Sequence, residues 1–595
     1  MKGIREYFGS NWFALSYSVR FVPRSTLIMA VLYAVSGILP YANAFLLGKL
    51  VNSIVTGASS HSYNDILWTI VLYALFSTLP TLFGNLQRYV NRYRMLTLQM
   101  EADLDLLFHR ERIDIAKYED PKFQDLLQRT LRNGMNPLYQ LSNAQFDMIR
   151  ALVGFIVGTT LSISFSPWVY ILVIASAIPA FITDIKYAGK SWSIWAKDSP
   201  EQRRLANLRW HIMNRVYLIE TKLFQSGEKI LGWTRKIYQD FAMLQRRLEK
   251  SRVWQSTFAD TLAFAGFAGG IYLIVQDVIA GALSVGTLVY MMGTLSSVRA
   301  SINNLLEIIS GQFENHLIAQ DLKEVINTPT VVPEAKNPQT LELKAAPEII
   351  FEKVSFRYPN SSKWILRNIS LTFKSGEKIG LVGNNGAGKT TLVKLLCRIY
   401  DPTEGKILIN GIDLRAISMT EWWSYLSVMF QDYATYDFQV KEAIAIGKPS
   451  EKLSLAKVKE AADLSQASTF IEEWKGTYDH QLGVEFGGTE PSKGQRQKLS
   501  IAKVLYRNAH IMILDEPTAS VDAESEAKIF DSLENLSKDT TALMISHDFS
   551  TISQCGQIFV LEEGKLIEKG DHHQLMKQDG KYAELYNLQA KRFKK

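Results

Sequence analysis

The stretch Gly383-Asn384-Asn385-Gly386-Ala387-Gly388-Lys389-Thr390 decides the fold of the second half of the chain. It follows the apolar run 379–382 and precedes 392–396, which has the composition of a helix. A strand, a glycine-rich turn and a helix in this order form a phosphate cradle, because the backbone N–H groups turn inward at the positive helix N-terminus. We expect Lys389 to neutralise the β- and γ-phosphates, Thr390 to bind Mg²⁺ and Thr391 to contact the nucleotide. The stretch therefore predicts a nucleotide-binding loop.

Two carboxylates follow another buried strand in the same half. The apolar run 511–514 ends in Asp515 and Glu516. Asp515 is expected to hold the Mg²⁺ shell, and Glu516 to orient or deprotonate the attacking water. A strand that merely ends in acids is the alternative, but the loop upstream favours the catalytic interpretation.

Three further side chains are candidates for the same site. Gln431 and His547 each come at the end of an apolar run, so they are predicted as a Mg²⁺ or water ligand and as a hydrogen-bond donor to the γ-phosphate. A histidine at a strand end can also be purely structural. Tyr358 is predicted to stack on the adenine ring, and packing on the sheet is its alternative.

The first half of the chain has the pattern of a membrane domain. The 595 residues are 47% hydrophobic and 21% charged, an ordinary average that hides six long apolar runs. These runs are predicted as membrane spans, and they lie at about 27–47, 66–86, 148–164, 168–185, 261–275 and 283–298. Residues 1–24 have apolar positions at helical spacing among basic ones, which predicts an amphipathic helix in the membrane interface.

The distribution of Lys and Arg predicts the orientation of the spans. Residues 52–65, 164–167 and 276–284 contain neither, whereas 88–150 and 186–256 are rich in both. Positive loops stay in the cytoplasm, so both chain ends and the two long loops are expected there. The net charge of +7 suits an anionic inner leaflet and is no nucleic-acid signature. The two cysteines, Cys397 and Cys555, imply no disulfide framework.

Together these motifs resemble the ATP-binding cassette superfamily, and six spans followed by one cassette resemble a type I exporter half-transporter over essentially the whole chain. The resemblance implies ATP and Mg²⁺ as cofactors and a head-to-tail dimer that sandwiches each ATP. It also assigns family motifs to the residues already named: A-loop Tyr358, Walker A 383–390, Q-loop Gln431, Walker B Asp515 and Glu516, D-loop 519–522 and switch histidine His547.

This resemblance gives a multi-domain fold class: an all-α six-helix transmembrane domain plus an α/β P-loop cassette. The expected domains are the interfacial helix 1–24, the transmembrane domain 25–326 with its two long cytoplasmic loops, the proline-punctuated linker 327–347 and the cassette 348–595. The protein is expected to be a multi-pass protein of the cytoplasmic membrane with its cassette in the cytoplasm.

The signature motif departs from the family form L-S-G-G-Q. It reads Pro491-Ser492-Lys493-Gly494-Gln495, so Ser492, Gly494 and Gln495 would still supply donors to the γ-phosphate of a partner's ATP. Lys493 could crowd that site, or its charge could help to hold ATP. A homodimer with two impaired but competent sites and a heterodimer with one poor site both remain open, and the homodimer is preferred.

The two long loops indicate a substrate class. Residues 118–129 and 220–227, together with 483–488 before the signature, resemble exporters of lantibiotics and related peptides, whose loop tips carry coupling helices that contact the cassettes. No protease domain precedes the spans, so leader cleavage is not expected. The predicted function is ATP-driven peptide export. Membrane lipids are expected as further partners, and nucleic acid is not. A drug or lipid exporter, an importer and an ATP-gated channel are the alternatives.

Overall fold

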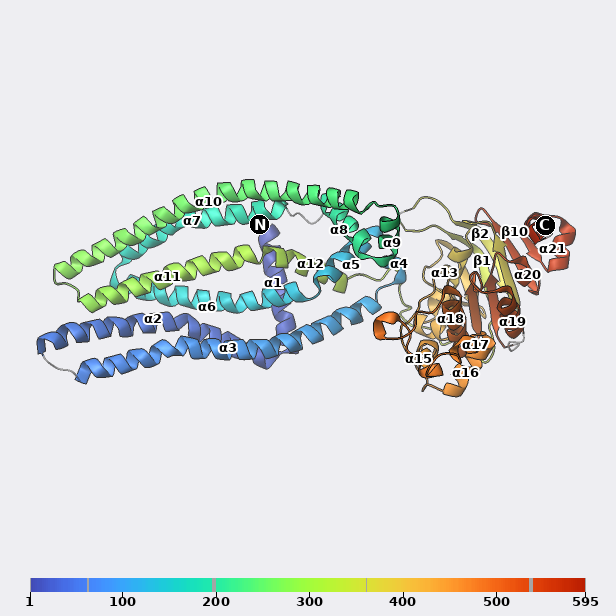
Figure 1. Cartoon of the computed structure of the whole chain (residues 1–595), viewed down its shortest axis with the longest axis horizontal. Coiled ribbons are helices and arrows are strands. Elements are labelled where there is room, and N and C mark those ends of the chain that lie inside the picture. The colour runs from blue at the N-terminus through green and yellow to red at the C-terminus, as the bar shows by residue number, and fades with distance from the viewer. Residues whose placement is uncertain (1, 61–63, 195–199, 360, 535–538, 594–595) are drawn as a thin grey trace. The chain divides into compact units, whose positions relative to one another are not determined.

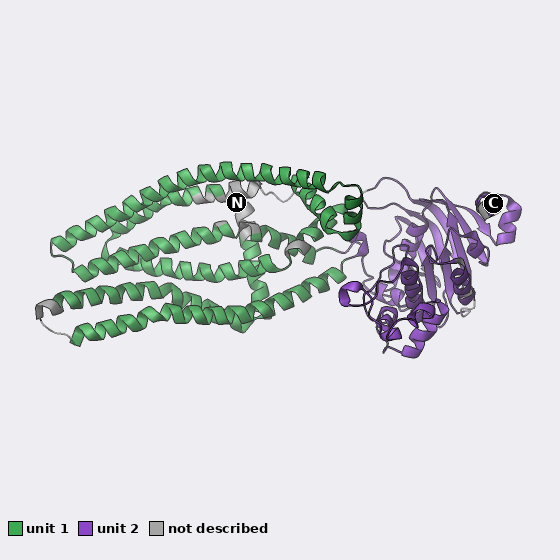
Figure 2. Ribbon diagram, viewed as in Figure 1, with its two compact units in different colours: residues 1–113, 120–329 green, residues 114–119, 330–595 purple. Residues whose placement is uncertain are grey.

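The structure, a computed structural model, describes residues 2–60, 64–194, 200–359, 361–534 and 539–593 (Figure 1). The first residue of the predicted interfacial helix and the last two residues of the predicted cassette therefore lie outside the described residues. The chain forms two compact units. Unit 1 comprises Met1–Ile113 and Asp120–Pro329, and unit 2 comprises Asp114–Glu119 and Thr330–Lys595 (Figure 2).

Unit 1 is helical throughout its described residues, and six of its helices are long. The connections of α6 to α7 and of α10 to α11 lie at the same end of the unit as the start of α3 (Figure 1). The helices are α1 (Lys2–Phe21), α2 (Pro23–Ser60), α3 (Asn64–Glu111), α5 (Pro121–Asn133), α6 (Asn136–Phe165), α7 (Pro167–Ile194), α8 (Pro200–Met213), α9 (Arg215–Leu223), α10 (Gly227–Ile279), α11 (Val285–Gly311) and α12 (Phe313–Ile326).

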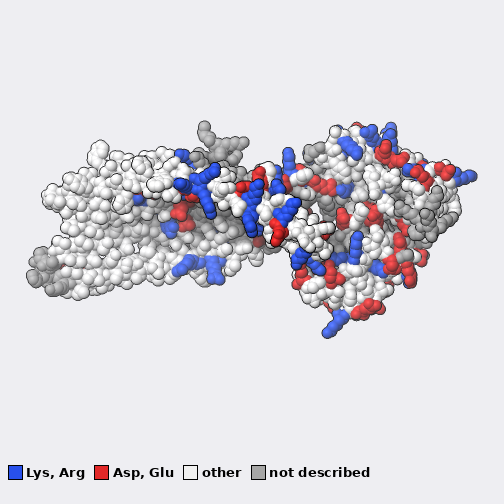
Figure 3. Space-filling view, turned by 45° about the horizontal axis from the view of Figure 1, so that its top comes forward, with Lys and Arg blue, Asp and Glu red and all other residues white. Residues whose placement is uncertain are grey.

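Length and composition identify four described helices that could cross a membrane: α2, α3, α6 and α10. A shorter apolar stretch, Pro167–Thr183, lies in α7. The face of unit 1 in Figure 3 is almost free of charged side chains toward one end. Large apolar side chains near the starts of α3 and α7, such as Trp68 and Trp168, are exposed. Such a surface is expected where lipid replaces water as the solvent.

Small residues let the helices of unit 1 approach closely. A Cβ atom on Gly48 of α2 would lie 2.5 Å from the carbonyl oxygen of Gly286 in α11, and the reverse contact would be 2.1 Å. The Gly286 N–H donates to Asn52 Oδ1 at 2.7 Å. Backbone contact through small residues, reinforced by a hydrogen bond, is how helices associate where lipid offers no hydrophobic driving force.

Helix α1 has two distinct faces. Ala14, Tyr17 and Ser18 are buried against the bundle, whereas Trp12 and Val19 are exposed. The buried Ser18 lies within hydrogen-bonding distance of Ser142 in α6, at 2.5 Å between the hydroxyl oxygens. The exposed side chains of α1 also include Ser16 and Arg20, so this face mixes apolar, polar and basic groups as the membrane interface requires.

Unit 2 contains two sheets. The antiparallel sheet has the order β2-β1-β4-β5, and the second has the order β10-β9-β3-β8-β7-β6. In the second sheet only β10 is antiparallel to its neighbour. The strands are β1 (Ile349–Phe356), β2 (Leu366–Phe373), β3 (Lys378–Gly383), β4 (Glu404–Ile409), β5 (Ile412–Asp413), β6 (Leu426–Met429), β7 (Ile511–Asp515), β8 (Thr541–Ile545), β9 (Gln557–Glu562) and β10 (Lys565–Gly570).

Helices cover the strands of unit 2, as a buried parallel sheet requires. They are α4 (Ile115–Tyr118), α13 (Lys389–Leu396), α14 (Met419–Ser424), α15 (Val440–Ala445), α16 (Leu455–Leu464), α17 (Ser468–Ile471), α18 (Lys493–Arg507), α19 (Ala523–Glu534), α20 (Phe549–Ile552), α21 (His572–Gln578) and α22 (Lys581–Phe593). All five residues of both β7 and β8 are buried. Burial raises the pKa of the Cys397 and Cys555 thiols to about 12, so both are protonated packing residues.

Parallel strands place their carboxyl ends at one edge of a sheet, which is where ligands bind in α/β folds. The loop after β3 and the residues that follow β6, β7 and β8 therefore meet at the same edge. This edge holds most of the residues that the sequence predicts for nucleotide chemistry.

Candidate nucleotide-binding site

The predicted phosphate loop lies between β3 and α13. Gly386 and Gly388 have φ angles of 80° and 103°, a region that side chains rarely adopt, and Gly388 caps the N-terminus of α13. A Cβ atom on Gly388 would also lie 2.6 Å from Leu366 Cδ2. The loop can therefore turn at the helix N-terminus and present backbone N–H groups to an anion.

Lys389 lies at the centre of this loop. Its ammonium group donates to the carbonyl oxygens of Gly383 at 2.7 Å and Asn384 at 3.3 Å, and the residue is 8% exposed. Burial lowers the pKa of Lys389, and the nearby carboxylates of Asp515 and Glu516 oppose that shift. A buried cation that is bonded to two carbonyl oxygens is well placed to bind phosphate oxygens.

Two of the three predicted metal ligands, Thr390 and Asp515, lie together. Thr390 Oγ1 donates to Asp515 Oδ2 at 3.2 Å, and Asp515 is 2% exposed. Burial raises the pKa of Asp515 to about 6. Among the described residues, no three His, Cys, Asp or Glu side chains could hold a metal by themselves. A hydroxyl and a carboxylate fit Mg²⁺, which prefers oxygen ligands and takes the rest from phosphate and water.

Glu516 is held by two of the other predicted residues. Its Oε2 accepts a hydrogen bond from Gln431 Nε2 at 3.0 Å, and its Oε1 lies 3.1 Å from His547 Nε2. The φ angle of Glu516 is 52°, a conformation that is uncommon for a residue with a side chain. A hydrogen bond from its N–H to the Ile545 carbonyl, at 2.8 Å, keeps the residue on the sheet.

This arrangement brings together three residues that are distant in the sequence. Gln431, Glu516 and His547 come from the ends of β6, β7 and β8, so the parallel sheet itself assembles them. A carboxylate between an amide and an imidazole can accept a proton from water while its neighbours hold the water or the phosphate.

Tyr358 lies beside the loop. Its hydroxyl is 3.1 Å from Thr391 Oγ1, and its ring makes edge contacts with Phe356 and Tyr400 at 5.1 and 5.3 Å. The ring thus packs on the antiparallel sheet, as the structural alternative expected. The half-buried ring is at the same time near enough to the loop to offer a surface to a base.

The predicted signature motif begins α18. Ser492 caps the helix, and Ser492 and Gln495 form a reciprocal capping box with hydrogen bonds of 2.9 and 3.2 Å. A Cβ atom on Gly494 would lie 2.6 Å from the Ser520 carbonyl oxygen, so only glycine fits there. Lys493 is exposed, and its carbonyl oxygen accepts from the Tyr433 hydroxyl at 3.2 Å.

Gln497 is a site residue that sequence reasoning did not identify. It is 2% exposed, its Nε2 donates to the Glu516 carbonyl oxygen at 3.1 Å and its Oε1 accepts from the Ser520 N–H at 2.9 Å. It therefore joins the signature helix to the end of β7. The available signal was an amide on the buried face of an amphipathic helix, since buried polar groups need specific bonding partners.

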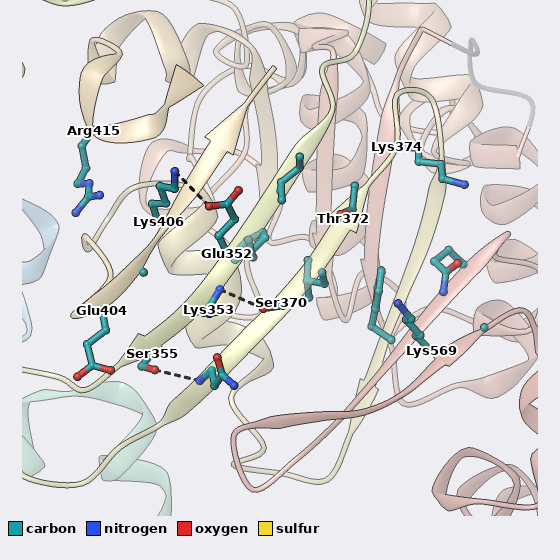
Figure 4. A pocket seen from close by; sticks show the side chains of 18 of the residues that line it. Glu352, Lys353, Ser355, Ser370, Thr372, Lys374, Glu404, Lys406, Arg415 and Lys569 are labelled. Atoms are coloured by element: carbon teal, nitrogen blue, oxygen red, sulfur yellow. Dashed lines mark hydrogen bonds and ion pairs between the residues drawn. The ribbon is translucent and has the colours of Figure 1, made fainter. Parts of the chain in front are cut away.

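A large hollow of about 1280 Å³ lies elsewhere in unit 2 (Figure 4). It is lined by strands of the antiparallel sheet together with β9 and β10, and Glu352 and Lys406 form an ion pair of 3.2 Å on its wall. None of its lining residues is a predicted nucleotide ligand. The nucleotide site is thus defined by its chemistry and not by the size of a pocket.

Comparison with known proteins supports these assignments of fold. A family model described as "ABC transporter" matches residues 366–519. The subtilin transport ATP-binding protein SpaT of Bacillus subtilis is 26% identical over 550 residues, covering 91% of this chain and 88% of that protein. The nisin transport ATP-binding protein NisT of Lactococcus lactis subsp. lactis is 25% identical over 574 residues, covering 95% and 93%.

Two further proteins extend the comparison. An ATP-dependent lipid A-core flippase of Desulfotalea psychrophila is 27% identical over 563 residues, covering 91% of this chain and 96% of the flippase. A solved structure of a bacterial Atm1-family ABC exporter with ATP bound superposes with a TM-score of 0.82 at 22% identity, covering 96% of this chain and 99% of the exporter. The fold class predicted from the sequence is confirmed.

Proposed function

Since this chain is an ABC exporter half-transporter, a multi-pass membrane protein whose cytoplasmic cassette hydrolyses ATP to drive transport, we propose that it exports a peptide across the cytoplasmic membrane. The observation that carries the catalytic part is the Glu516 carboxylate, held between Gln431 and His547 next to the phosphate loop. The peptide part rests on the subtilin and nisin transport proteins, which match over nearly the whole chain.

In the proposed nucleotide site, Tyr358 stacks on the adenine and the loop 383–391 surrounds the phosphates. The loop N–H groups and Lys389 bind the β- and γ-phosphate oxygens. Thr390 and Asp515 would hold Mg²⁺, with Gln431 as a further oxygen ligand, and the metal supplies positive charge that neutralises the phosphates. The distance of 3.2 Å between Thr390 Oγ1 and Asp515 Oδ2 agrees with both oxygens binding one metal ion.

The proposed hydrolysis uses the three residues at the strand ends. Glu516 accepts a proton from the attacking water, and His547 donates a hydrogen bond to the γ-phosphate. Gln431 orients the water or the metal. Each Glu516 oxygen can accept a further hydrogen bond, so a water can bind beside Gln431. His547 Nε2 carries at most one proton, so its donation to the γ-phosphate would replace its present contact with Glu516.

An exposed apolar helix end in unit 1 is a candidate contact surface. Val216 and Leu223 on α9 are 70% and 75% exposed, and the adjacent Phe224 is 77% exposed. A cytoplasmic helix end with this surface is expected to bury it against another protein. We assign this surface to contact with a cassette. In a dimer, the signature residues Ser492, Gly494 and Gln495 of a second copy would complete the ATP site.

A complementation experiment tests the homodimer. Lys389→Ala disables the phosphate loop and Ser492→Ala disables the signature, so each variant alone is expected to have little ATPase activity. In a mixed dimer both defects fall on one of the two sites, and the other site is intact. Activity in the mixed sample, with none in either separate sample, supports a homodimer. An inactive wild-type chain that gains activity only with a co-purified sister subunit refutes it.

Transport is tested in proteoliposomes that contain the wild-type chain or Glu516→Gln. We expect wild-type vesicles to move a candidate peptide from the cassette side to the opposite side in an ATP-dependent way. Glu516→Gln should bind ATP but lose turnover by about 100-fold or more. Flipping of a labelled lipid without peptide movement would favour the alternative suggested by the flippase relative. Movement in the reverse direction, or ion flux that outruns hydrolysis, would overturn export.

A further inference from the structure

The segment Asp114–Glu119 packs with unit 2, although it lies in the chain between two helices of unit 1. Its helix α4 places Ala116, 7% exposed, in the hydrophobic core of the cassette. At its start, Asp114 Oδ2 accepts a hydrogen bond from the Val332 N–H at 2.9 Å. The segment is therefore part of the cassette, and its two ends carry one carboxylate each.

The carboxylate at the other end, Glu119, makes two contacts. Its Oε1 accepts from Lys394 Nζ and its Oε2 from the Tyr400 hydroxyl, both at 2.5 Å. Burial and the bond to Glu119 raise the pKa of Tyr400, so the phenol keeps its proton and donates. Hydrogen bonds with an ionised group are the stronger class, and Lys394 and Glu119 are both partly shielded from solvent.

Lys394 and Tyr400 also both contact the ring of Tyr358. The Lys394 ammonium lies 5.6 Å from the centre of that ring, and the Tyr400 ring meets it at 5.3 Å and 89°. Lys394 belongs to α13, the helix that begins at the phosphate loop, and the Tyr358 hydroxyl lies 3.1 Å from Thr391 on the same helix. One carboxylate thus holds both side chains that fix the orientation of this ring.

We propose that Glu119 is a positioning residue for nucleotide binding, which fixes the ring of Tyr358 through Lys394 and Tyr400. The inference rests on the proposed nucleotide site, in which this ring stacks on the adenine. When Glu119 is in place, the ring is preorganised and the base binds without an ordering cost. Thermodynamic linkage makes this effect reciprocal. The factor by which the attached segment Asp114–Glu119 raises the affinity for nucleotide is also the factor by which bound nucleotide strengthens the attachment of the segment to the cassette.

The test is a set of substitutions in the full chain, purified in lipid nanodiscs. Glu119→Gln is expected to raise the KM for ATP about five- to tenfold, while kcat at saturating ATP stays within about twofold of the wild type because the residues at the γ-phosphate are untouched. Tyr400→Phe removes only the hydroxyl and should raise KM in the same direction. It serves as the second variant should Glu119→Gln unfold.

A double-mutant cycle separates this role from a merely structural one. In a Tyr358→Leu background, Glu119→Gln should cause no further rise in KM, because the proposed path runs through that ring. The matched control is Glu352→Gln, which breaks an ion pair of 3.2 Å with Lys406 on the sheet face outside this network. It should leave KM unchanged.

Three results would overturn the inference: an unchanged KM in Glu119→Gln, effects that add in the double variant, or a loss of kcat at constant KM. A wild-type chain that binds no ATP would refute the proposed function instead. The two failures are therefore distinguishable.

Discussion

Thr390 Oγ1 and Asp515 Oδ2 are joined by a hydrogen bond of 3.2 Å, which connects the first turn of α13 to the last residue of β7. The acceptor is a buried carboxylate whose pKa is raised to about 6. Without a metal, this carboxylate binds protons more tightly in the folded than in the unfolded chain. Its contribution to stability is therefore largest at low pH and is lost as the pH rises from about 4 to about 6.

Asp515→Asn should remove the free-energy cost of burying an ionised carboxylate, while keeping an oxygen that accepts the hydrogen bond from Thr390. In magnesium-free, nucleotide-free buffer above pH 6, we expect the variant to be more stable than the wild type by about 3 kcal/mol, and its ATPase activity to be lost. Thermal unfolding between pH 4.5 and 8 is the measurement. Asp522→Asn is the control of opposite sign, because hydrogen bonds from Ser525 lower the pKa of Asp522 to about 2. A destabilised Asp515→Asn at neutral pH would contradict the expectation.

The contact between Glu516 and His547 predicts non-additive kinetics. His547→Ala should lower kcat about 10- to 100-fold, with a smaller effect on the KM for ATP. Combined with Glu516→Gln, it should cause little further loss, because residues that act as one unit are not independent. Single-turnover hydrolysis measures all three variants. Multiplicative losses would show that the histidine acts separately from the carboxylate.

Gln497 should matter more than its position outside the predicted site suggests. Gln497→Met keeps the volume but leaves the Glu516 carbonyl oxygen and the Ser520 N–H without their bond to this amide. We expect a loss of about 1–3 kcal/mol of stability and a clear drop in ATPase activity. Gln554→Met, at an exposed position, is the matched control for thermal unfolding and activity. Equal behaviour of both variants would remove Gln497 from the site.

The signature offers a comparison of adjacent residues. Gly494→Ala places a Cβ atom 2.6 Å from the Ser520 carbonyl oxygen, a backbone atom that cannot move aside. We expect destabilisation of about 1–3 kcal/mol and impaired hydrolysis. Lys493→Ala makes no such clash, since this side chain is exposed, and the melting temperature should not change. The ATPase activity of Lys493→Ala then decides whether the lysine crowds the nucleotide, which predicts a gain, or helps to hold it, which predicts a loss.

The sequence predicted the parts of the fold and site that depend on local pattern. The phosphate loop was predictable because glycine spacing and apolar flanks are short-range features, and both occur as β3 and α13. The meeting of Gln431, Glu516 and His547 was predictable from a rule of topology, since the ends of parallel strands share an edge.

Contacts between distant segments could not be predicted in this way. Glu119 meets Lys394 and Tyr400 across 275 and 281 residues, and no periodicity in either segment encodes such a pair. The bridge made by Gln497 depends on how α18 packs against the end of β7, and the requirement for glycine at position 494 depends on the path of the Ser520 backbone. These features are set by tertiary packing.

The close approach of Gly48 and Gly286 constrains how the membrane domain can move. Neither backbone leaves room for a side chain, and Asn52 accepts a hydrogen bond from the Gly286 N–H. Helices α2 and α11 are therefore held in close contact at that point. Helix α10 packs mainly along α7 instead. We therefore expect α2 and α11 to move together, so that a change in the opening of the membrane domain would occur between groups of helices and not between these two.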